Sequence, residues 1–553
     1  MLNVELTKKY NEWLEKAIAD PDLIAELKSM DDAKKEDAFY RDLAFGTGGL
    51  RGVIGAGTNR MNVYTVGKAS QGLANYVNAH YNNPSIAISY DSRIKSDLFS
   101  KVAAGVFAAN DIHVYIYPQL MPTPLLSYAV RYLGCSAGVM VTASHNPSKY
   151  NGYKVYGADG CQITTEAAKE ILGFIEKVDV FADVKRSKFE IGENIEWIGE
   201  DVYTSFVEQI KKQTPVAGEI FDKSVAIVYS PLNGTGLMPV TRVLEECGYK
   251  NITIVKEQEQ PDGNFPTCPY PNPEIREAME LGIKYAKEND AELLLATDPD
   301  CDRCGIAVKD GDEYKLLTGN ETGLLLLDWI CERRIANDTM PKNPVLVKTI
   351  VTSDMGEQIA DHYGVKTVNV LTGFKFIGEQ IGLLEKNNRE DDYIFGFEES
   401  YGYLSGSYVR DKDAVDAAFL ICEMFAWYKS KGISLVEKLD QLYKEYGYRL
   451  NTLHSYTFEG SAGFEKMKGI MQKFRCQVVF GRKIEKILDY KGGLDGLPKS
   501  DVLKFILDGG SVVVRPSGTE PKLKVYISIS AASMEKAGEI EQGISKQIEE
   551  YMK

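Results

Sequence analysis

The sequence is poor in cysteine, with nine among 553 residues and no closely spaced framework. A disulfide-stapled secreted fold is therefore not indicated, and we expect reduced thiols and a cytoplasmic protein. Cys301 and Cys304 form a C-x-x-C pattern, but no second pair follows at the spacing of a zinc ribbon. We expect no zinc site from this pattern. A reactive thiol pair is the secondary interpretation.

Long hydrophobic runs and an excess of positive charge are also absent. The most apolar stretch, TGLLLLDWICE (322–332), is far too short to span a bilayer, and residues 1–20 resemble an amphipathic helix rather than a signal peptide. The formal net charge is −15, which disfavours nucleic acid or an acidic membrane as the main partner. A small anionic substrate is still allowed, because a local group of Arg and Lys can override the global charge.

The sequence does contain a strand, helix and strand pattern three times, beginning near Ser85, Ser224 and Pro344. This order predicts βαβ units with parallel strands. The chain is also longer than one hydrophobic core usually supports. We therefore expect three similar α/β domains. A single large sheet built from successive βαβ units is the alternative.

The C-terminal part departs from this pattern. The stretch from Asp501 to Ala531 predicts a helix and then two strands joined by a polar loop, and a long closing helix follows. This order indicates a smaller α+β domain with an antiparallel sheet. The predicted domains span residues 1–200, 201–322, 323–450 and 451–553.

A first chemical loop, TASHNP (142–147), follows a strand of small apolar residues. Its proline favours a sharp turn, so we expect Ser144 to be exposed at the strand end, where α/β folds present catalytic groups. His145 is adjacent, but successive side chains usually point apart, which argues against a direct Ser-His relay. Lys154 follows an Asn-Gly turn and could return towards Ser144. A tight loop with a capping serine is the structural alternative.

A second loop, DPDCDR (298–303), follows the buried-strand pattern ELLLA. Asp298, Asp300 and Asp302 alternate along an extended segment, which directs three carboxylates to one side, where a cation must offset their repulsion. Hard oxygen ligands indicate Mg²⁺ or Ca²⁺, and room left for water or a phosphate oxygen favours Mg²⁺. A solvated acidic turn is the alternative.

Two further loops carry groups that suit a phosphorylated, polyhydroxylated ligand. In RPSGTEP (515–521), the arginine, the hydroxyls and a glycine backbone offer donors for a phosphate, whereas a plain hairpin loop needs no arginine. In GFEESYG (396–402), Glu398, Glu399 and Ser400 can bind sugar hydroxyls, although a solvated acidic turn fits equally well. Arg51 lies in the glycine-rich FGTGGLRG, and Lys375 lies in LTGFKFIG.

TASHNP, DPDCDR, GFEES and RPSGTEP, in this order, resemble the signature loops of the α-D-phosphohexomutase superfamily, the phosphoglucomutases and phosphomannomutases. The resemblance covers almost the whole chain, from about Gly46 to near the C-terminus. Four motifs in one order make it specific. It implies an α/β fold of three similar domains with mixed sheets, and a C-terminal α+β domain that closes one central cleft. It also implies small-molecule sugar phosphates as substrates.

The resemblance further implies a role for each matching residue. Ser144 is expected to carry a phosphoryl group, to give it to a sugar monophosphate, and to take the other phosphate back from a glucose 1,6-bisphosphate intermediate that also acts as activator. Mg²⁺ is expected at Ser144 and the three aspartates. Lys154 matches a proposed general acid/base, and Arg51 and His145 are the other catalytic candidates. The expected substrate-binding residues are Arg303, Gly373, Lys375, Glu398, Ser400, Arg515, Ser517, Gly518 and Thr519.

The sugar loop departs from one branch of the family. Bifunctional bacterial phosphomannomutase/phosphoglucomutases typically read GEMSGH, whereas this chain reads FEESYG, and the missing histidine leaves the second general acid/base unassigned. The Glu-Glu-Ser form is more similar to phosphoglucomutases, so we expect glucose phosphate as substrate. Phosphomannomutase and phosphopentomutase are alternatives with the same mechanism. A non-catalytic sugar-phosphate-binding relative and a metal-dependent phosphatase are alternatives of other classes.

Overall fold

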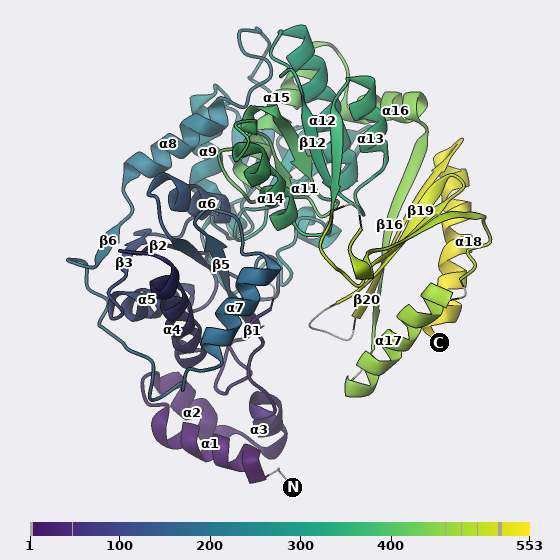
Figure 1. The fold of residues 1–553 in the computed structure, drawn as a ribbon. Helices are drawn as coiled ribbons and strands as arrows, with labels where there is room; N and C mark the ends of the chain where they lie inside the picture. The colour runs from purple at the N-terminus through teal and green to yellow at the C-terminus, as the bar shows by residue number, and fades with distance from the viewer. Residues whose placement is uncertain (1–3, 47, 459, 477, 495, 518–521) are drawn as a thin grey trace.

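The computed structural model describes residues 4–46, 48–458, 460–476, 478–494, 496–517 and 522–553. Within these residues the strands form four sheets that follow one another along the chain (Figure 1). Each sheet with its helices is one unit, and we propose that the four units correspond to the four predicted domains. No helix among the described residues is long and apolar enough to cross a membrane. All nine cysteines are free thiols.

The first unit contains a mixed sheet of order β1-β5-β4-β2-β3-β6. Strands β3 and β4 run parallel to β2, whereas β5 runs antiparallel to β4 and to β1. Helices α1 to α3 lie at the end of the unit near the N-terminus (Figure 1). The bounds are α1 Val4–Lys16, α2 Pro21–Ser29, α3 Asp32–Phe39, β1 Gly49–Val53, α4 Val63–His80, β2 Ser85–Tyr90, α5 Ser96–Ala108, β3 His113–Ile116, α6 Thr123–Tyr132, β4 Ala137–Val141, β5 Tyr150–Gly157, α7 Thr165–Ile175 and β6 Ile195–Trp197.

The second unit repeats this plan with the order β11-β10-β9-β7-β8. Strands β8 and β9 run parallel to β7, and β10 runs antiparallel to both β9 and β11. The bounds are α8 Glu200–Lys211, β7 Ile227–Ser230, α9 Leu237–Glu246, β8 Ile252–Ile254, α10 Lys256–Glu259, α11 Arg276–Glu288, β9 Leu293–Thr297, β10 Cys304–Asp310 and β11 Glu313–Leu317.

The third unit has the order β13-β12-β14-β15, with β13 and β14 parallel to β12 and β15 antiparallel to β14. The bounds are α12 Gly319–Ala336, β12 Val345–Thr349, α13 Met355–His362, β13 Lys366–Val370, α14 Phe374–Glu385, the 3-10 helix η1 Glu390–Asp392, β14 Tyr393–Phe397, β15 Tyr403–Leu404, α15 Ala414–Ser430 and α16 Leu435–Tyr446.

The fourth unit is an antiparallel sheet of order β16-β20-β19-β18-β17 with helices beside it (Figure 1). The bounds are β16 Tyr448–Thr457, α17 Gly460–Cys476, β17 Ile484–Asp489, the 3-10 helix η2 Tyr490–Gly492, β18 Leu503–Leu507, β19 Gly510–Pro516, β20 Lys522–Ala531 and α18 Met534–Met552.

The hydrophobic cores differ in how they join the units. The largest apolar cluster runs through the second and third units and includes part of the first unit, such as Leu125, Met140 and Tyr156. The first unit and the fourth unit also have a cluster of their own. A small cluster joins the third unit to the fourth, where Ile350 and Val351 meet Val513 and Tyr526. The loops of the second and third units therefore share one packed support, whereas the fourth unit is attached through a smaller contact.

The three predicted βαβ units are confirmed as β2-α5-β3, β7-α9-β8 and β12-α13-β13, each with parallel strands. The predicted helix at the start of the stretch from Asp501 was wrong, because Leu503–Leu507 forms β18. This strand pairs with β19 through a hairpin at Asp508 and Gly509, and Gly509 has a φ of 77°. Asp-Gly is a strong hairpin signal, and it decides the structure of this short apolar run.

Candidate active site

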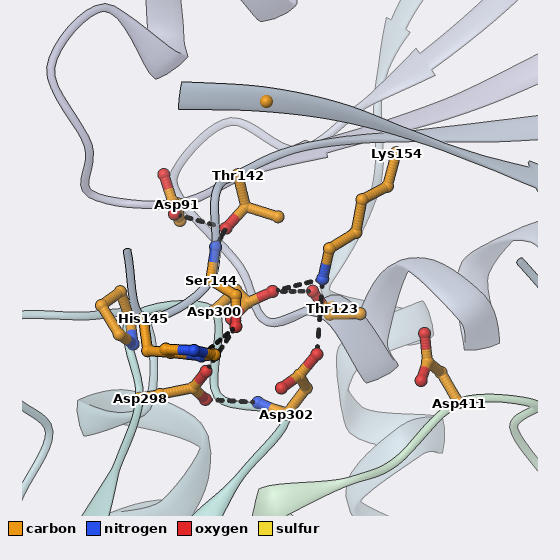
Figure 2. Close-up of polar contacts among 12 residues, drawn as sticks. Asp91, Thr123, Thr142, Ser144, His145, Lys154, Asp298, Asp300, Asp302 and Asp411 are labelled. Carbon is orange, nitrogen blue, oxygen red and sulfur yellow. Dashed lines mark hydrogen bonds and ion pairs between the residues drawn. The ribbon is translucent and has the colours of Figure 1, made fainter. Parts of the chain in front are cut away.

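Ser144 lies in the turn after β4, and its backbone has a φ of 53°, a left-handed conformation that few residues other than glycine adopt. Its amide donates to Thr142 Oγ1 at 2.8 Å, and Thr142 in turn donates to Asp91 at 2.6 Å. Its hydroxyl donates to Asp298 Oδ2 at 2.9 Å (Figure 2). The turn therefore directs the hydroxyl of the first unit onto a carboxylate of the second.

Two expectations about this turn were wrong. Ser144 is only 4% exposed, because the aspartate loop of the second unit covers it. His145 does not point away from it, since His145 Nδ1 lies 3.2 Å from Ser144 Oγ. The left-handed serine changes the direction of the chain and brings the two side chains together. Burial, with the charges of Arg303 and Arg51, lowers the pKa of His145 well below its ordinary value.

Asp298, Asp300 and Asp302 follow β9 and converge on one point. One carboxylate oxygen of each lies within 4.8 Å of the others, and all three residues are at most 1% exposed. Asp298 Oδ1 accepts the backbone N–H groups of Asp302 and Arg303 at 3.1 and 3.0 Å, which holds the loop in its turn. The three carboxylates are close together, as predicted, but the predicted extended segment was wrong. Residues 299–301 form a turn, in which Cys301 donates its amide to the carbonyl of Asp298 at 2.9 Å and has a φ of 51°.

Two lysines partly neutralise these carboxylates. Lys154, extending from β5, lies 2.8 Å from Asp300 Oδ2 and 3.4 Å from Asp302 Oδ2 (Figure 2). Lys412 lies 2.9 Å from Asp302 Oδ2. Burial alone would raise the pKa of Asp300, but the charge and hydrogen bond of Lys154, together with the charge of Lys412, outweigh burial and lower that pKa. Burial and the two neighbouring carboxylates raise the pKa of Asp298.

The donor set fits a hard divalent cation. Asp300 Oδ1 and Asp302 Oδ1 are buried and have no hydrogen-bond partner among the described residues. Buried carboxylate oxygens without a donor are costly unless a cation or water satisfies them. Oxygen ligands suit Mg²⁺ or Ca²⁺ rather than zinc. The cluster can therefore bind a metal ion, which accords with the expectation from the three aspartates.

A cavity of about 540 Å³ opens beside this cluster and is lined by residues of all four units. Its walls bring together seven of the predicted residues: Arg51, His145, Arg303, Gly373, Glu398, Ser400 and Arg515. Within the described part of the chain, Lys375 and Ser517 are not among its lining residues. Gly518 and Thr519 lie outside the described residues.

Two contacts define how the wall residues are held. Glu398 Oε1 accepts the amide of Gly373 at 3.0 Å, which ties the sugar loop to the start of α14. Arg303 forms an ion pair with Glu274. Glu274 also lines the cavity and was not among the residues predicted from the sequence. Arg303, which we expected to bind the substrate, thus already has a carboxylate partner in the cavity wall.

Sequence reasoning also missed Lys412 and Lys524, and both line the cavity. Lys412 follows the sugar loop in the charged run RDKD (410–413). This run is the sequence feature that could have indicated Lys412 as a site residue. The charges of Asp302, Asp411 and Glu398 outweigh burial and raise the pKa of Lys412. Lys524 lies directly opposite Arg515 in the β19-β20 pairing. Like charges opposite each other repel, and a bound anion would relieve this repulsion.

Comparison with known proteins identifies the family. Four models of the phosphoglucomutase/phosphomannomutase family match in order: alpha/beta/alpha domain I at residues 42–180, domain II at 203–311, domain III at 318–446 and the C-terminal domain at 466–546. The chain belongs to this family. It is therefore an enzyme, a mutase of sugar phosphates, and the family predicted from the four loops is confirmed.

Curated relatives agree over most of the chain. A phosphoglucomutase of Staphylococcus saprophyticus is 37% identical over 513 residues, which cover 89% of this chain and 91% of the relative. A phosphoglucomutase of Staphylococcus aureus (strain USA300) is 36% identical over 541 residues, which cover 95% of this chain and 96% of the relative.

Solved structures of phosphohexomutases share the fold. A putative phosphomannomutase from Thermus thermophilus superposes with a TM-score of 0.69 at 20% identity, over 92% of this chain and 99% of that one. The phosphoglucomutase parafusin from Paramecium gives 0.68 at 19% identity, over 92% of this chain and 96% of that one. The predicted α/β fold class, with an α+β C-terminal part, is confirmed.

Proposed function

We propose that this enzyme interconverts α-D-glucose 1-phosphate and glucose 6-phosphate through a phosphoserine at Ser144. The observation that carries the proposal is the 2.9 Å contact between the Ser144 hydroxyl and the buried aspartate cluster, beside a cavity with Arg515 and Glu398 in its walls. The two staphylococcal relatives that bear the name phosphoglucomutase support glucose as the sugar. The Glu-Glu-Ser loop supports the same choice.

In the proposed reaction, the phosphoryl group of phosphorylated Ser144 passes to a hydroxyl of the sugar monophosphate. The bond from phosphorus to Ser144 Oγ breaks, a bond from phosphorus to the sugar oxygen forms, and the product is glucose 1,6-bisphosphate. The bisphosphate reverses its orientation, and its other phosphate returns to Ser144. The sugar hydroxyl loses a proton in the first transfer, and Ser144 Oγ gains one.

The two lysines beside Asp302 are the candidates for these proton transfers. Lys154 would donate to Ser144 Oγ, because it extends toward the aspartates from the strand that follows the serine loop. Lys412 lines the cavity, whereas Lys154 does not belong to its lining among the described residues. Because the neighbouring carboxylates raise its pKa, Lys412 would donate a proton to the sugar oxygen when the other phosphate returns to Ser144. Lys412 would then take the role that the missing histidine left unassigned.

We propose that Asp298, Asp300, Asp302 and phosphorylated Ser144 hold Mg²⁺. When bound, this ion would neutralise charge that develops on the transferring phosphoryl group. Arg51, His145 and Arg303 line the cavity and are proposed to contact that group. Glu398 and Ser400 are proposed to bind the sugar hydroxyls, with Gly373 beside them.

The phosphate that is not being transferred is proposed to bind at the fourth unit. Arg515 and Lys524 supply two cationic groups from adjacent strands. Ser517, Gly518 and Thr519 follow Arg515 in the loop and are proposed to add hydroxyl and backbone donors. Lys375 is proposed to contribute positive charge from α14, although burial and the charge of Arg515 lower its pKa.

The test is a mutase assay with Mg²⁺ and a trace of glucose 1,6-bisphosphate, run in parallel on α-glucose 1-phosphate, α-mannose 1-phosphate and ribose 1-phosphate. We expect clear preference for glucose. Preference for mannose or ribose would keep the mechanism and replace the substrate. Release of inorganic phosphate without isomerisation would indicate a phosphatase, and no turnover of any substrate would contradict the proposal.

A further inference from the structure

Arg93 follows β2 in the sequence SYDSR (89–93), and its side chain is fully buried. Its guanidinium donates to four carbonyl groups of the loop that carries Ser144. Nη1 donates to the carbonyls of Pro147 and Tyr150 at 3.0 Å each. Nη2 donates to the carbonyls of Ser144 and Asn146. One side chain thus binds the loop from its first turn to the start of β5.

The loop has few backbone bonds of its own. Asn146 donates its amide to the carbonyl of Ala143 at 3.2 Å, and Tyr150 donates to Pro147 at 3.0 Å. Ser144 itself is in the left-handed region, which costs energy for a residue with a side chain unless its surroundings hold it there. The four bonds from Arg93 supply such a constraint at the carbonyl of the strained residue.

Asp91 connects this guanidinium to the opposite side of Ser144. Asp91 Oδ2 lies 3.3 Å from Arg93 Nε and accepts the hydroxyl of Thr142 at 2.6 Å. Thr142 Oγ1 accepts the amide of Ser144. The amide and the carbonyl of Ser144 are therefore both held, directly or through one side chain, by a single buried ion pair.

The second unit covers this ion pair. The ring of Phe265 lies over the Arg93 guanidinium, with its centroid at 5.1 Å. Gly263, in the same loop, approaches the backbone of residues 92–94 so closely that a Cβ would come within 2.5 Å of the Ile94 nitrogen. The unit that carries the three aspartates thus packs on the residue that holds the serine loop.

We propose that Arg93 is a positioning residue, which fixes Ser144 in its left-handed conformation facing Asp298, and that Phe265 couples this conformation to the docked second unit. Arg93 itself does not line the cavity among the described residues, so its effect reaches the reaction through Ser144. If the proposed function holds, Arg93 affects the rate of phosphoryl transfer without binding the sugar phosphate.

The first test needs no substrate. Amide hydrogen exchange is compared in wild type, Arg93→Lys and the control Arg60→Lys, which alters an arginine of the first unit paired with Asp37 away from the loop. A lysine keeps the charge but loses the planar fork that reaches four carbonyls. We expect faster exchange of residues 144–150 in Arg93→Lys alone, with β2 and β4 still protected. Unchanged exchange of the loop would overturn the proposal.

The second test is kinetic and rests on the proposed function. Arg93→Lys should lower kcat by about 10²-fold, the effect expected when a reacting group is displaced by about 1 Å, with KM within about twofold of wild type. A rise in KM with unchanged kcat would overturn the proposal. If wild type itself shows no mutase activity, the proposed function is contradicted. The hydrogen-exchange experiment still tests the positioning role of Arg93, because it needs no substrate.

Phe265→Leu provides a second variant in case Arg93→Lys does not fold. It keeps an apolar side chain over Arg93 and removes the cation–π contact. We expect loop exchange to quicken and kcat to fall by about threefold to tenfold, again at constant KM and with β2 and β4 still protected. Wild-type exchange and kcat in this variant would overturn the coupling to the second unit.

Discussion

The two ends of the cavity are built differently. At the Ser144 end, Ser144 and the three aspartates are buried, and contacts already join them to one another and to the partly buried Lys154 and Lys412. At the fourth-unit end, Arg515 and Lys524 lie opposite each other across β19 and β20, where their charges repel. We call the Ser144 end the chemical end and the Arg515 end the binding end. The side chains of the chemical end are held in place before a ligand arrives, whereas the positive charges of the binding end would be compensated by a phosphate.

The attachment of the fourth unit fits this difference. Besides the small apolar cluster, several polar contacts join it to the third unit, and Asp354 accepts two of them, from Lys504 at 3.2 Å and from Ser511 at 3.3 Å. Lys504 also donates to the carbonyl of Ile350 at 3.0 Å. The unit that is proposed to bind the phosphate not being transferred is thus joined by polar contacts, while the second and third units share one core.

The largest expected effect is at the chemical end. Ser144→Ala removes the proposed phosphoryl carrier, so turnover should fall by roughly 10³-fold or more, as for loss of a nucleophile. The melting temperature should change little, because Asp298 keeps its two backbone hydrogen bonds. Ser187→Ala, which removes a first-unit hydroxyl that donates to the carbonyl of Gly105, is the control. Near-normal turnover in Ser144→Ala would contradict the phosphoserine mechanism.

The aspartate cluster predicts a stability effect that needs no activity assay. Mg²⁺ should raise the melting temperature of wild type, because a ligand that binds only the folded state stabilises it. Asp300→Asn removes one carboxylate and should abolish most of that rise, and it should also abolish most of the turnover. Chelation should inactivate wild type reversibly. A variant that keeps the full Mg²⁺-dependent rise would place the metal elsewhere.

The chemical end was also the more predictable of the two from sequence. TASHNP and DPDCDR are each one continuous stretch of sequence, so the residue types within each motif alone indicate a nucleophile and a metal site. The burial of Ser144 could not be predicted, because it arises when the second unit packs against the loop. Lys412 was missed for the same reason, since its contact with Asp302 joins positions far apart in the chain. Arg93 acts through backbone carbonyls, which leave no motif.

The prediction of the fold from sequence was limited in the same way, to features that are local in the chain. The βαβ units were predictable because each is local, with a strand, a helix and a strand in succession. The short run Leu503–Leu507 was read as a helix, and only the Asp-Gly turn after it distinguishes a hairpin from a helical segment. The cavity itself combines residues from four units, and no single stretch of sequence defines it.

A smaller effect is expected at the fourth-unit end. Substitutions there should weaken substrate binding, and one of them should at the same time raise the stability of the ligand-free enzyme. Arg515→Ala or Lys524→Met should raise KM by the equivalent of about 2 kcal/mol, the typical worth of a charge-assisted bond. Lys524→Met should slightly raise the melting temperature of the ligand-free enzyme, because it removes the repulsion with Arg515. Lys486→Met, in β17, is the control. A fall in kcat at constant KM would contradict a binding role.

The polar contact between the third and fourth units should matter less for the reaction. Asp354→Asn keeps the shape of the side chain but removes the charge that faces Lys504 and Lys348. We expect a modest rise in KM, by roughly threefold to tenfold for a loss of about 1 kcal/mol, and earlier unfolding of the fourth unit in hydrogen exchange. Faster exchange spread equally over all four units would contradict a local role for this contact.

The last effect is expected on stability alone and concerns Glu399, which also lines the cavity. Burial, and then the charge of Glu398, raises the pKa of Glu399 from 4.5 to about 7. The folded state therefore binds this proton more tightly than the unfolded state, so stability should fall as the pH rises from about 4.5 through about 7, and then level off. Glu399→Gln should remove this contribution, by about 1 to 3 kcal/mol between about pH 5 and about pH 8. Urea unfolding of both proteins across that range measures the difference, and parallel pH profiles would show that Glu399 does not titrate there.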